Sequence, residues 1–263
     1  MLYTLSRVIM TQLTIAASNR DRFDLKSIST QWFLKSLENQ TCKDFEVLIA
    51  DGGSKNVEEI KDYFSNKDRI TMRVAELELG EKFERARLNN VGIRNAETPY
   101  IMTTDVDMFF GPKFVETLME KITPKRFIES RTLYWKYQAA QLIYSGQLDP
   151  FVDLESCKIG RIKKRTTAGG CQCAHIDRWS KVRGFDEKYI GWGSEDWDLL
   201  TRMKMSGAKV VWLGESREEI MLFHQPHTKN VKLELEEQHK NKKLLNKIVD
   251  FKVNPNGWGG IDG

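Results

Sequence analysis

The chain has 263 residues, enough for one large α/β domain or two small ones with a substantial core. Its 41 basic and 37 acidic residues give a formal charge of +4, which suits anionic small ligands and falls well short of a nucleic-acid-binding composition. We therefore do not expect nucleic acid as a partner.

Cysteine usage and hydropathy indicate a protein of a reducing compartment. Four irregularly spaced cysteines argue against a disulfide framework: Cys42, Cys157, Cys171 and Cys173. The pair Cys171 and Cys173 lacks the usual zinc-knuckle spacing, so we interpret both as small buried hydrophobes. No apolar run approaches about 18 residues, and the N-terminus lacks the pattern of a signal peptide. We expect a cytoplasmic protein without a transmembrane segment.

The first half alternates short apolar runs with helical patterns. We predict helices at 24–40, 57–66 and 82–96, and strands at 12–18, 45–51, 70–77 and 100–110. This alternation predicts a mostly parallel sheet with helices on both faces. Ligands of such sheets bind beyond the carboxyl ends of the strands. The polar residues at those ends are Ser18, Asn19, Arg20, Asp51, Asp105 and Asp107.

The second half is less regular. We predict a strand at 126–135, a helix at 138–146, a polar loop at 147–168, a helix at 194–207 and a strand at 208–214. Ser194 is the expected N-cap of the 194–207 helix, acidic residues fill its first turn, and Gly207 ends it. A strongly charged helix at 232–250 is interpreted as a solvated amphipathic element.

Three acidic residues at strand ends are candidate ligands. Alternation along one strand would point the Asp105 and Asp107 carboxylates the same way, and two hard oxygen donors suit Mg²⁺ or Mn²⁺ with a diphosphate. A solvated turn is the alternative for this pair. Asp51 either forms the turn before Gly52 and Gly53 or accepts hydrogen bonds from a base or ribose.

One methionine and two histidines in the segment "EIMLFHQPH" are further candidate metal ligands. His224 and His227 lie three residues apart, although a lone histidine is more often an ordinary core or surface residue. Met221 offers a sulfur ligand or is a core methionine.

Several motifs occur together in the order found in one enzyme family. They are "EKFERARLNNVGIRNA" (81–96), "TTDVDMFF" (103–110), the glycine pair and "GWGSEDWDLL" within 167–203, and "IMLFH" (220–224). In this order they resemble the β-1,4-galactosyltransferase family. The earlier segments "TIAASNR" and "FEVLIADGGS" are similar to bacterial family 2 glycosyltransferases. Together the resemblance covers residues 12–228.

The resemblance implies a glycosyltransferase A-type fold: an α/β, Rossmann-like, mostly parallel sheet flanked by helices, with an acceptor-binding C-terminal part. We expect one domain over residues 1–263, with a nucleotide-binding half (1–110), an acceptor and metal half (111–228), and a C-terminal helix and tail (229–263).

The resemblance also assigns roles to individual residues. Asp107, Met221 and His224 would hold Mn²⁺, with Mg²⁺ as the alternative, and Asp105 would lie near the ribose and the metal. Donor-side contacts are implied for Arg20, Asp51, Phe83, Arg85, Gly169 and Gly170. Trp192 matches the tryptophan of a mobile loop over donor and acceptor. Asp196 matches the catalytic base, and Glu195 the acid that holds the acceptor.

These roles imply metal-dependent, inverting transfer from a UDP-sugar of the galactose or N-acetylhexosamine type to a hydroxyl of a glycan or another acceptor. Retaining relatives that transfer N-acetylgalactosamine carry asparagine in place of Asp196, so an inverting reaction is expected here. A retaining enzyme, a nucleotidyltransferase and a catalytically silent sugar-binding homologue are the alternatives. The chain departs from the family at Ser194, where the family has glycine, and at Trp197, where it has an acid. The helix N-terminus would lower the pKa of Asp196.

Overall fold

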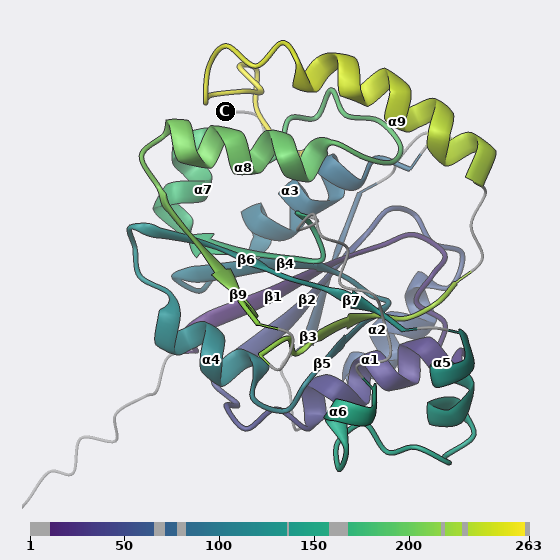
Figure 1. Cartoon of the computed structure of the whole chain (residues 1–263). Helices are drawn as coiled ribbons and strands as arrows, with labels where there is room; N and C mark the ends of the chain where they lie inside the picture. The colour runs from purple at the N-terminus through teal and green to yellow at the C-terminus, as the bar shows by residue number, and fades with distance from the viewer. Residues whose placement is uncertain are drawn as a thin grey trace, which may run out of the picture.

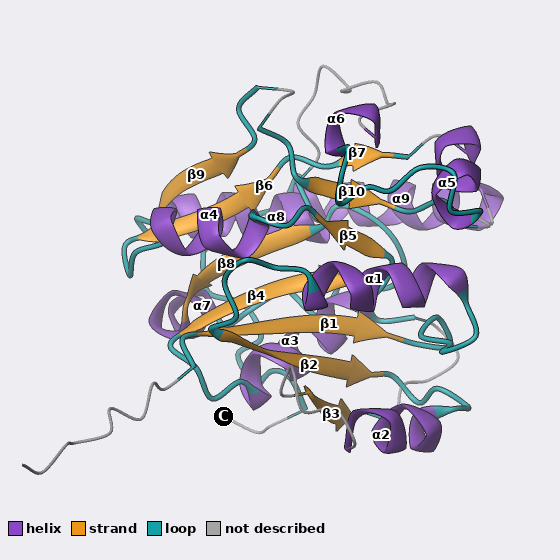
Figure 2. Cartoon of the chain, turned by 90° about the horizontal axis from the view of Figure 1, so that it is seen from below, coloured by secondary structure: helices purple, strands orange, loops and turns teal. Residues whose placement is uncertain are grey.

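The computed structural model describes residues 11–65, 72–77, 83–135, 137–157, 168–216, 219–227 and 231–260. A seven-stranded sheet runs through its centre (Figures 1 and 2). The strands lie in the order β3 (Met72–Glu76), β2 (Phe45–Asp51), β1 (Leu13–Asn19), β4 (Tyr100–Asp105), β8 (Cys171–His175), β6 (Arg126–Ser130) and β9 (Lys209–Leu213). Only β8 pairs antiparallel with its neighbours, which confirms the mostly parallel sheet.

Helices cover both faces of this sheet, as predicted (Figure 1). One face carries α1 (Ile28–Glu38), α2 (Val57–Ser65) and α4 (Phe114–Lys121), and the other α3 (Arg85–Asn95), α7 (Ile176–Val182) and α8 (Glu195–Met205). Alternation along β1 explains the two cores: Ile15 and Ala17 join the first apolar cluster, whereas Ala16 joins the second. The last helix, α9 (Val231–Leu245), packs against α8.

A small second sheet adjoins the first, and the sequence did not predict it. It consists of β5 (Met108–Phe110), β10 (Leu222–His224) and β7 (Leu133–Tyr134), with α5 (Tyr137–Tyr144) and α6 (Leu154–Cys157) nearby in sequence. The two strands predicted at 100–110 and 126–135 are therefore each divided between the two sheets. The first breaks at Val106 and Asp107, where the chain turns with the Val106 side chain buried.

Other differences are local. The strand β8 and helix α7 were missed, and the predicted loop 147–168 contains α6, while its residues 158–167 lie outside the described part. Cys171 and Cys173 are fully buried thiols, as expected. Among the described residues, the helices are too short or too polar to cross a lipid bilayer.

Candidate active site

A pocket opens where the carboxyl ends of β1 and β4 meet the N-termini of α3 and α8. Parallel strands present their carboxyl ends at one edge, which explains why distant sequence segments converge here. Eleven of the thirteen residues expected at the site line this pocket: Arg20, Phe83, Arg85, Asp105, Asp107, Gly169, Gly170, Trp192, Glu195, Asp196 and His224. Asp51 and Met221 do not.

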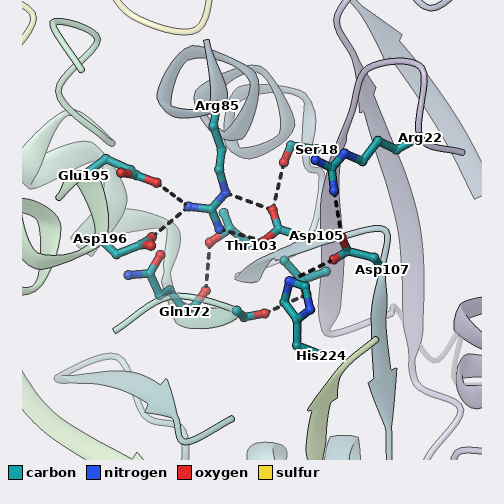
Figure 3. A network of polar contacts seen from close by, with 12 residues as sticks. Ser18, Arg22, Arg85, Thr103, Asp105, Asp107, Gln172, Glu195, Asp196 and His224 are labelled. Carbon is teal, nitrogen blue, oxygen red and sulfur yellow. Dashed lines mark hydrogen bonds and ion pairs between the residues drawn. The ribbon is translucent and has the colours of Figure 1, made fainter. Parts of the chain in front are cut away.

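Arg85 joins the two sides of the pocket (Figure 3). Its guanidinium donates from Nε to Asp105 Oδ1 at 2.8 Å and from Nη2 to Asp105 Oδ2 at 3.2 Å. The remaining nitrogen, Nη1, donates to Glu195 Oε1 at 2.9 Å and to Asp196 Oδ1 at 3.0 Å. A planar group with five N–H donors can satisfy all three carboxylates, whereas a lysine ammonium cannot reach them together.

Charge at this cluster is set by burial and by that shared cation. Burial opposes ionisation of Arg85, but Asp105, Asp196 and Glu195 outweigh it and raise its pKa well above the ordinary value. The same pairing overcomes burial at Asp105 and lowers the pKa of that carboxyl.

Across the pocket, at the start of α8, burial prevails over the arginine. It raises the pKa of Asp196, and together with the Asp196 charge it raises the pKa of Glu195 to about 7. The expectation that the helix N-terminus lowers the pKa of Asp196 is therefore wrong, because desolvation is the larger effect.

The start of α8 differs from the predicted cap. Ser194 occupies the N-cap position, but its side chain makes no capping hydrogen bond and its φ is +78°, in the left-handed region. The three acids do lie in the first turn, as predicted. Asp198 points elsewhere and pairs with the buried Arg202 at 2.6 Å, so it supports the packing of α8.

Gly169 allows Asp196 to approach the pocket floor. A Cβ at Gly169 would lie 2.8 Å from Asp196 Cγ, and the glycine φ is +102°. Only a residue without a side chain fits both constraints. Beneath this floor lies Glu129, fully buried, whose pKa burial raises well above its usual range. Its Oε1 accepts from Gln172 at 2.9 Å. Sequence patterns gave no signal for Glu129.

Asp107, His224 and His227 form a group suited to a metal ion. One ligand atom from each residue lies within 4.8 Å of the others. The Asp107 Oδ1 atom is buried and has no hydrogen-bond partner in the described part of the chain. His224 Nε2 lies 3.7 Å from that oxygen, and His227 Nε2 lies 3.5 Å from Oδ2. Carboxylate and imidazole donors suit Mn²⁺, so the residues present fit the ion that the sequence suggested.

Two residues expected at the site do not line the pocket. The Met221 side chain packs against the apolar core, so the structure does not bring it to the pocket beside Asp107. Asp51 is fully buried, and its carboxylate accepts hydrogen bonds from the Gly53 and Ser54 backbone and from the Asn19 and Ser54 side chains. These four bonds occupy the carboxylate and fix the loop after β2.

Some pocket residues escaped the sequence analysis. Arg22 pairs with Asp107 at 3.2 Å, and the Tyr134 ring stacks on His224 with ring centres 4.9 Å apart. Arg22 lies within the loop after the first strand, which was the available signal. Tyr134 ends β7, which lies within the strand predicted at 126–135, but the sequence did not predict that this part belongs to the small sheet. Trp197, which departs from the family, also lines the pocket.

Two family models match the sequence in separate segments. The model of glycosyl transferase family 2 matches residues 31–134, and the model described as the N-terminal domain of galactosyltransferase matches residues 152–226. Chondroitin synthase of Escherichia coli is 26% identical over 258 residues, covering 85% of this chain and 36% of its own length. The chain thus spans about a third of that relative.

Solved structures share the fold at low sequence identity. The S. aureus TarS 1–349 complex with UDP-GlcNAc superposes with a TM-score of 0.55 and 12% identity, covering 83% of this chain and 60% of TarS. The mannosyltransferase PcManGT of Pyrobaculum calidifontis, solved with GDP-Man and Mn²⁺, also has a TM-score of 0.55 at 12% identity, covering 83% of this chain and 57% of its own.

The fold and these matches place the chain in one structural class: proteins with the glycosyltransferase A-type fold. Within that class, the chain joins a first segment similar to family 2 with a second segment similar to galactosyltransferases.

Proposed function

We propose that the protein is a metal-dependent, inverting glycosyltransferase that moves a sugar from a UDP-sugar to a hydroxyl of a glycan or another acceptor. The observation that carries this proposal is the placement of Glu195 and Asp196 on the same pocket as Asp105, Asp107 and the two histidines. A carboxylate pair and a cation-binding group thus line a single pocket, as displacement of a diphosphate by a hydroxyl requires.

Asp196 is the proposed general base. It accepts the proton of the attacking hydroxyl while the bond from the anomeric carbon to the diphosphate oxygen breaks. Its raised pKa favours this role, since a base works best when its pKa lies near the operating pH. Glu195 lines the pocket beside it, which is why we assign this residue to the acceptor side.

Asp107, His224 and His227 are the proposed metal ligands. This set replaces Met221 of the sequence-based expectation by His227, because His227 is the group that lies beside the Asp107 carboxylate. A divalent ion bound there would neutralise the charge on the leaving diphosphate. Mn²⁺ is the proposed ion, with Mg²⁺ as the alternative.

The donor is proposed from chemistry and from the relatives. Gly169 and Gly170 line the pocket together with Asp196, and TarS was solved with UDP-GlcNAc. We therefore propose a UDP-sugar of the galactose or N-acetylhexosamine type. The similarity to E. coli chondroitin synthase supports a glycan acceptor.

The test is release of UDP from a panel of UDP-sugars with Mn²⁺ and with EDTA. We expect metal-dependent release with at least one donor. If no nucleotide sugar releases its nucleotide, with or without glycan acceptors, the proposed transferase activity is refuted. The alternative, a catalytically silent sugar-binding homologue, is then favoured. The anomeric configuration of the product separates inversion from retention, and retention would overturn the role of Asp196.

A further inference from the structure

Helix α9 does not behave as a free solvated helix. It lies beside α8 (Figure 1), and its Asn241 side chain is only 4% exposed. Its hydrogen-bond acceptors belong to the segment 189–194, which precedes α8 and which we call the Trp192 loop. The C-terminal helix is thus largely exposed, as the sequence predicted, and packs one face against this loop.

Hydrogen bonds fix the backbone of the Trp192 loop to α9. Asn241 Nδ2 donates to the carbonyl of Ile190 at 3.2 Å and to the carbonyl of Trp192 at 3.3 Å. Glu237 Oε2 accepts from the Trp192 backbone N–H at 2.9 Å. On the other side, the Gly191 N–H donates to the carbonyl of Phe83 at 3.0 Å. Of these four loop backbone groups, α9 provides the hydrogen-bond partner of three: the Ile190 carbonyl, the Trp192 carbonyl and the Trp192 N–H.

Two glycines of the loop lie close against side chains of α9. A Cβ at Gly191 would overlap the Glu237 carboxylate, and a Cβ at Gly193 would lie 3.3 Å from Gln238 Cγ. Both glycines have positive φ. The loop sequence is therefore matched to α9 as well as to the sugar site.

The same contacts reach the pocket. The Trp192 side chain lines the pocket and is 43% exposed, and Gln238, from the middle of α9, lines it as well. The resemblance implies a mobile loop here, whereas in this structure hydrogen bonds to α9 hold the loop backbone and so set the orientation of the indole at the pocket mouth. Glu237 and Asn241 provide the fixed points.

We propose that α9 is part of the active site, and that Glu237 and Asn241 are positioning residues which hold the Trp192 loop at the mouth of the pocket. The consequence for turnover rests on the proposed function, whereas the structural clamp does not. The two are therefore tested by separate measurements.

Hydrogen exchange of the full chain without ligands tests the clamp. Glu237→Ala and Asn241→Asp remove the acceptor and the donors, and Asn241→Asp places a carboxylate against two carbonyl oxygens. We expect exchange in the peptide 189–194 to become about tenfold faster, with β1 and β4 unchanged. Glu236→Gln, an exposed neighbour on α9, is the matched control and should match wild type. Unchanged exchange in the loop would overturn the clamp.

A double-variant cycle covers the case in which a single variant folds poorly. Gly191→Ala should speed loop exchange strongly in the wild-type background, because the new methyl group meets the Glu237 carboxylate. In the Glu237→Ala background the same change should have a smaller effect, since only the backbone strain at positive φ persists in both. Equal effects in the two backgrounds would show that Glu237 does not hold the loop.

Turnover tests the consequence. With the UDP-sugar and Mn²⁺ conditions that give UDP release, we expect Glu237→Ala and Asn241→Asp to lower kcat about tenfold while UDP binding stays within about twofold of wild type. Wild-type kcat in both variants would overturn the positioning role. Absence of UDP release by the wild-type protein would instead refute the proposed function, with the exchange result still deciding the clamp.

Discussion

Arg85 Nη1 lies 3.0 Å from the Oδ1 atom of Asp196, although 111 residues separate the two in sequence. The same guanidinium holds both oxygens of Asp105. The proposed base and the acidic end of β4 therefore share one cation. Removing that cation would leave several buried carboxylates without a partner, which is costly in a protein interior.

Arg85→Ala should accordingly lower the free energy of unfolding by about 3–5 kcal/mol, measured by urea denaturation. Arg85→Lys should recover only part of this loss, because one ammonium cannot bond three carboxylates at once. Arg87→Lys, on the same helix, is the control: its pair with Glu84 is 3.7 Å long and partly exposed, so stability should change by less than about 0.5 kcal/mol. Equal stability of Arg85→Lys and wild type would contradict the shared-cation account.

Asp196→Asn should reduce sugar transfer by about a hundredfold or more, since the amide cannot accept a proton. Binding of UDP, measured by calorimetry, should change little. Asp198→Asn provides the contrast, because Asp198 pairs with Arg202 and should affect unfolding more than kcat. Near-normal transfer by Asp196→Asn would assign the base elsewhere.

His224→Ala and His227→Ala should each raise the Mn²⁺ concentration needed for half-maximal thermal stabilisation by UDP, by about tenfold or more. Both rings lie beside Asp107, which is the reason to expect comparable effects. Met221→Leu should leave the Mn²⁺ requirement unchanged because its side chain packs against the core. A strong effect of Met221→Leu with none of His227→Ala would restore the ligand set expected from the sequence.

Glu195 should make folding stability depend on pH. Burial raises its pKa from 4.5 to about 7, so the folded protein holds a proton between these values that the unfolded chain releases. Its contribution is therefore largest below pH 4.5 and is lost as the pH rises toward 7, with a slope of at most about 1.4 kcal/mol per pH unit. Glu195→Gln should remove that slope in urea titrations of the metal-free protein. Parallel pH profiles of the two proteins would show that Glu195 is not perturbed.

Sequence patterns predicted the strands with a strong apolar pattern. They missed strands, such as β8, whose burial depends on contacts with neighbouring strands. The strands β1 and β2 are mostly apolar and buried along their whole length, as parallel strands usually are, and they were predicted within one residue of their bounds. By contrast β8 reads "CQCAH" and carries a buried glutamine, so its composition gives no strand signal. The glutamine is tolerated there because Glu129 accepts its hydrogen bond.

At the candidate site too, features that depend on tertiary contacts were missed. Resemblance to a family identified eleven of the residues that line the pocket, since their segments keep the family order. It did not give His227 a metal-binding role, because the position of that ring beside Asp107 depends on the turn after β10. It also could not show that the Asp51 carboxylate accepts hydrogen bonds from its own loop, or that burial raises the pKa of Asp196 despite the helix dipole.

The Arg85 cluster also lies across the junction between the two segments that resemble different families. Arg85 and Asp105 belong to residues 31–134, while Glu195 and Asp196 belong to residues 152–226. Recombining either segment with that of a distant relative would separate the arginine from acids chosen to match it. The two segments of this chain are thus constrained to change together, and we expect a graft of the first segment alone to destabilise the fold unless the whole cluster is carried with it.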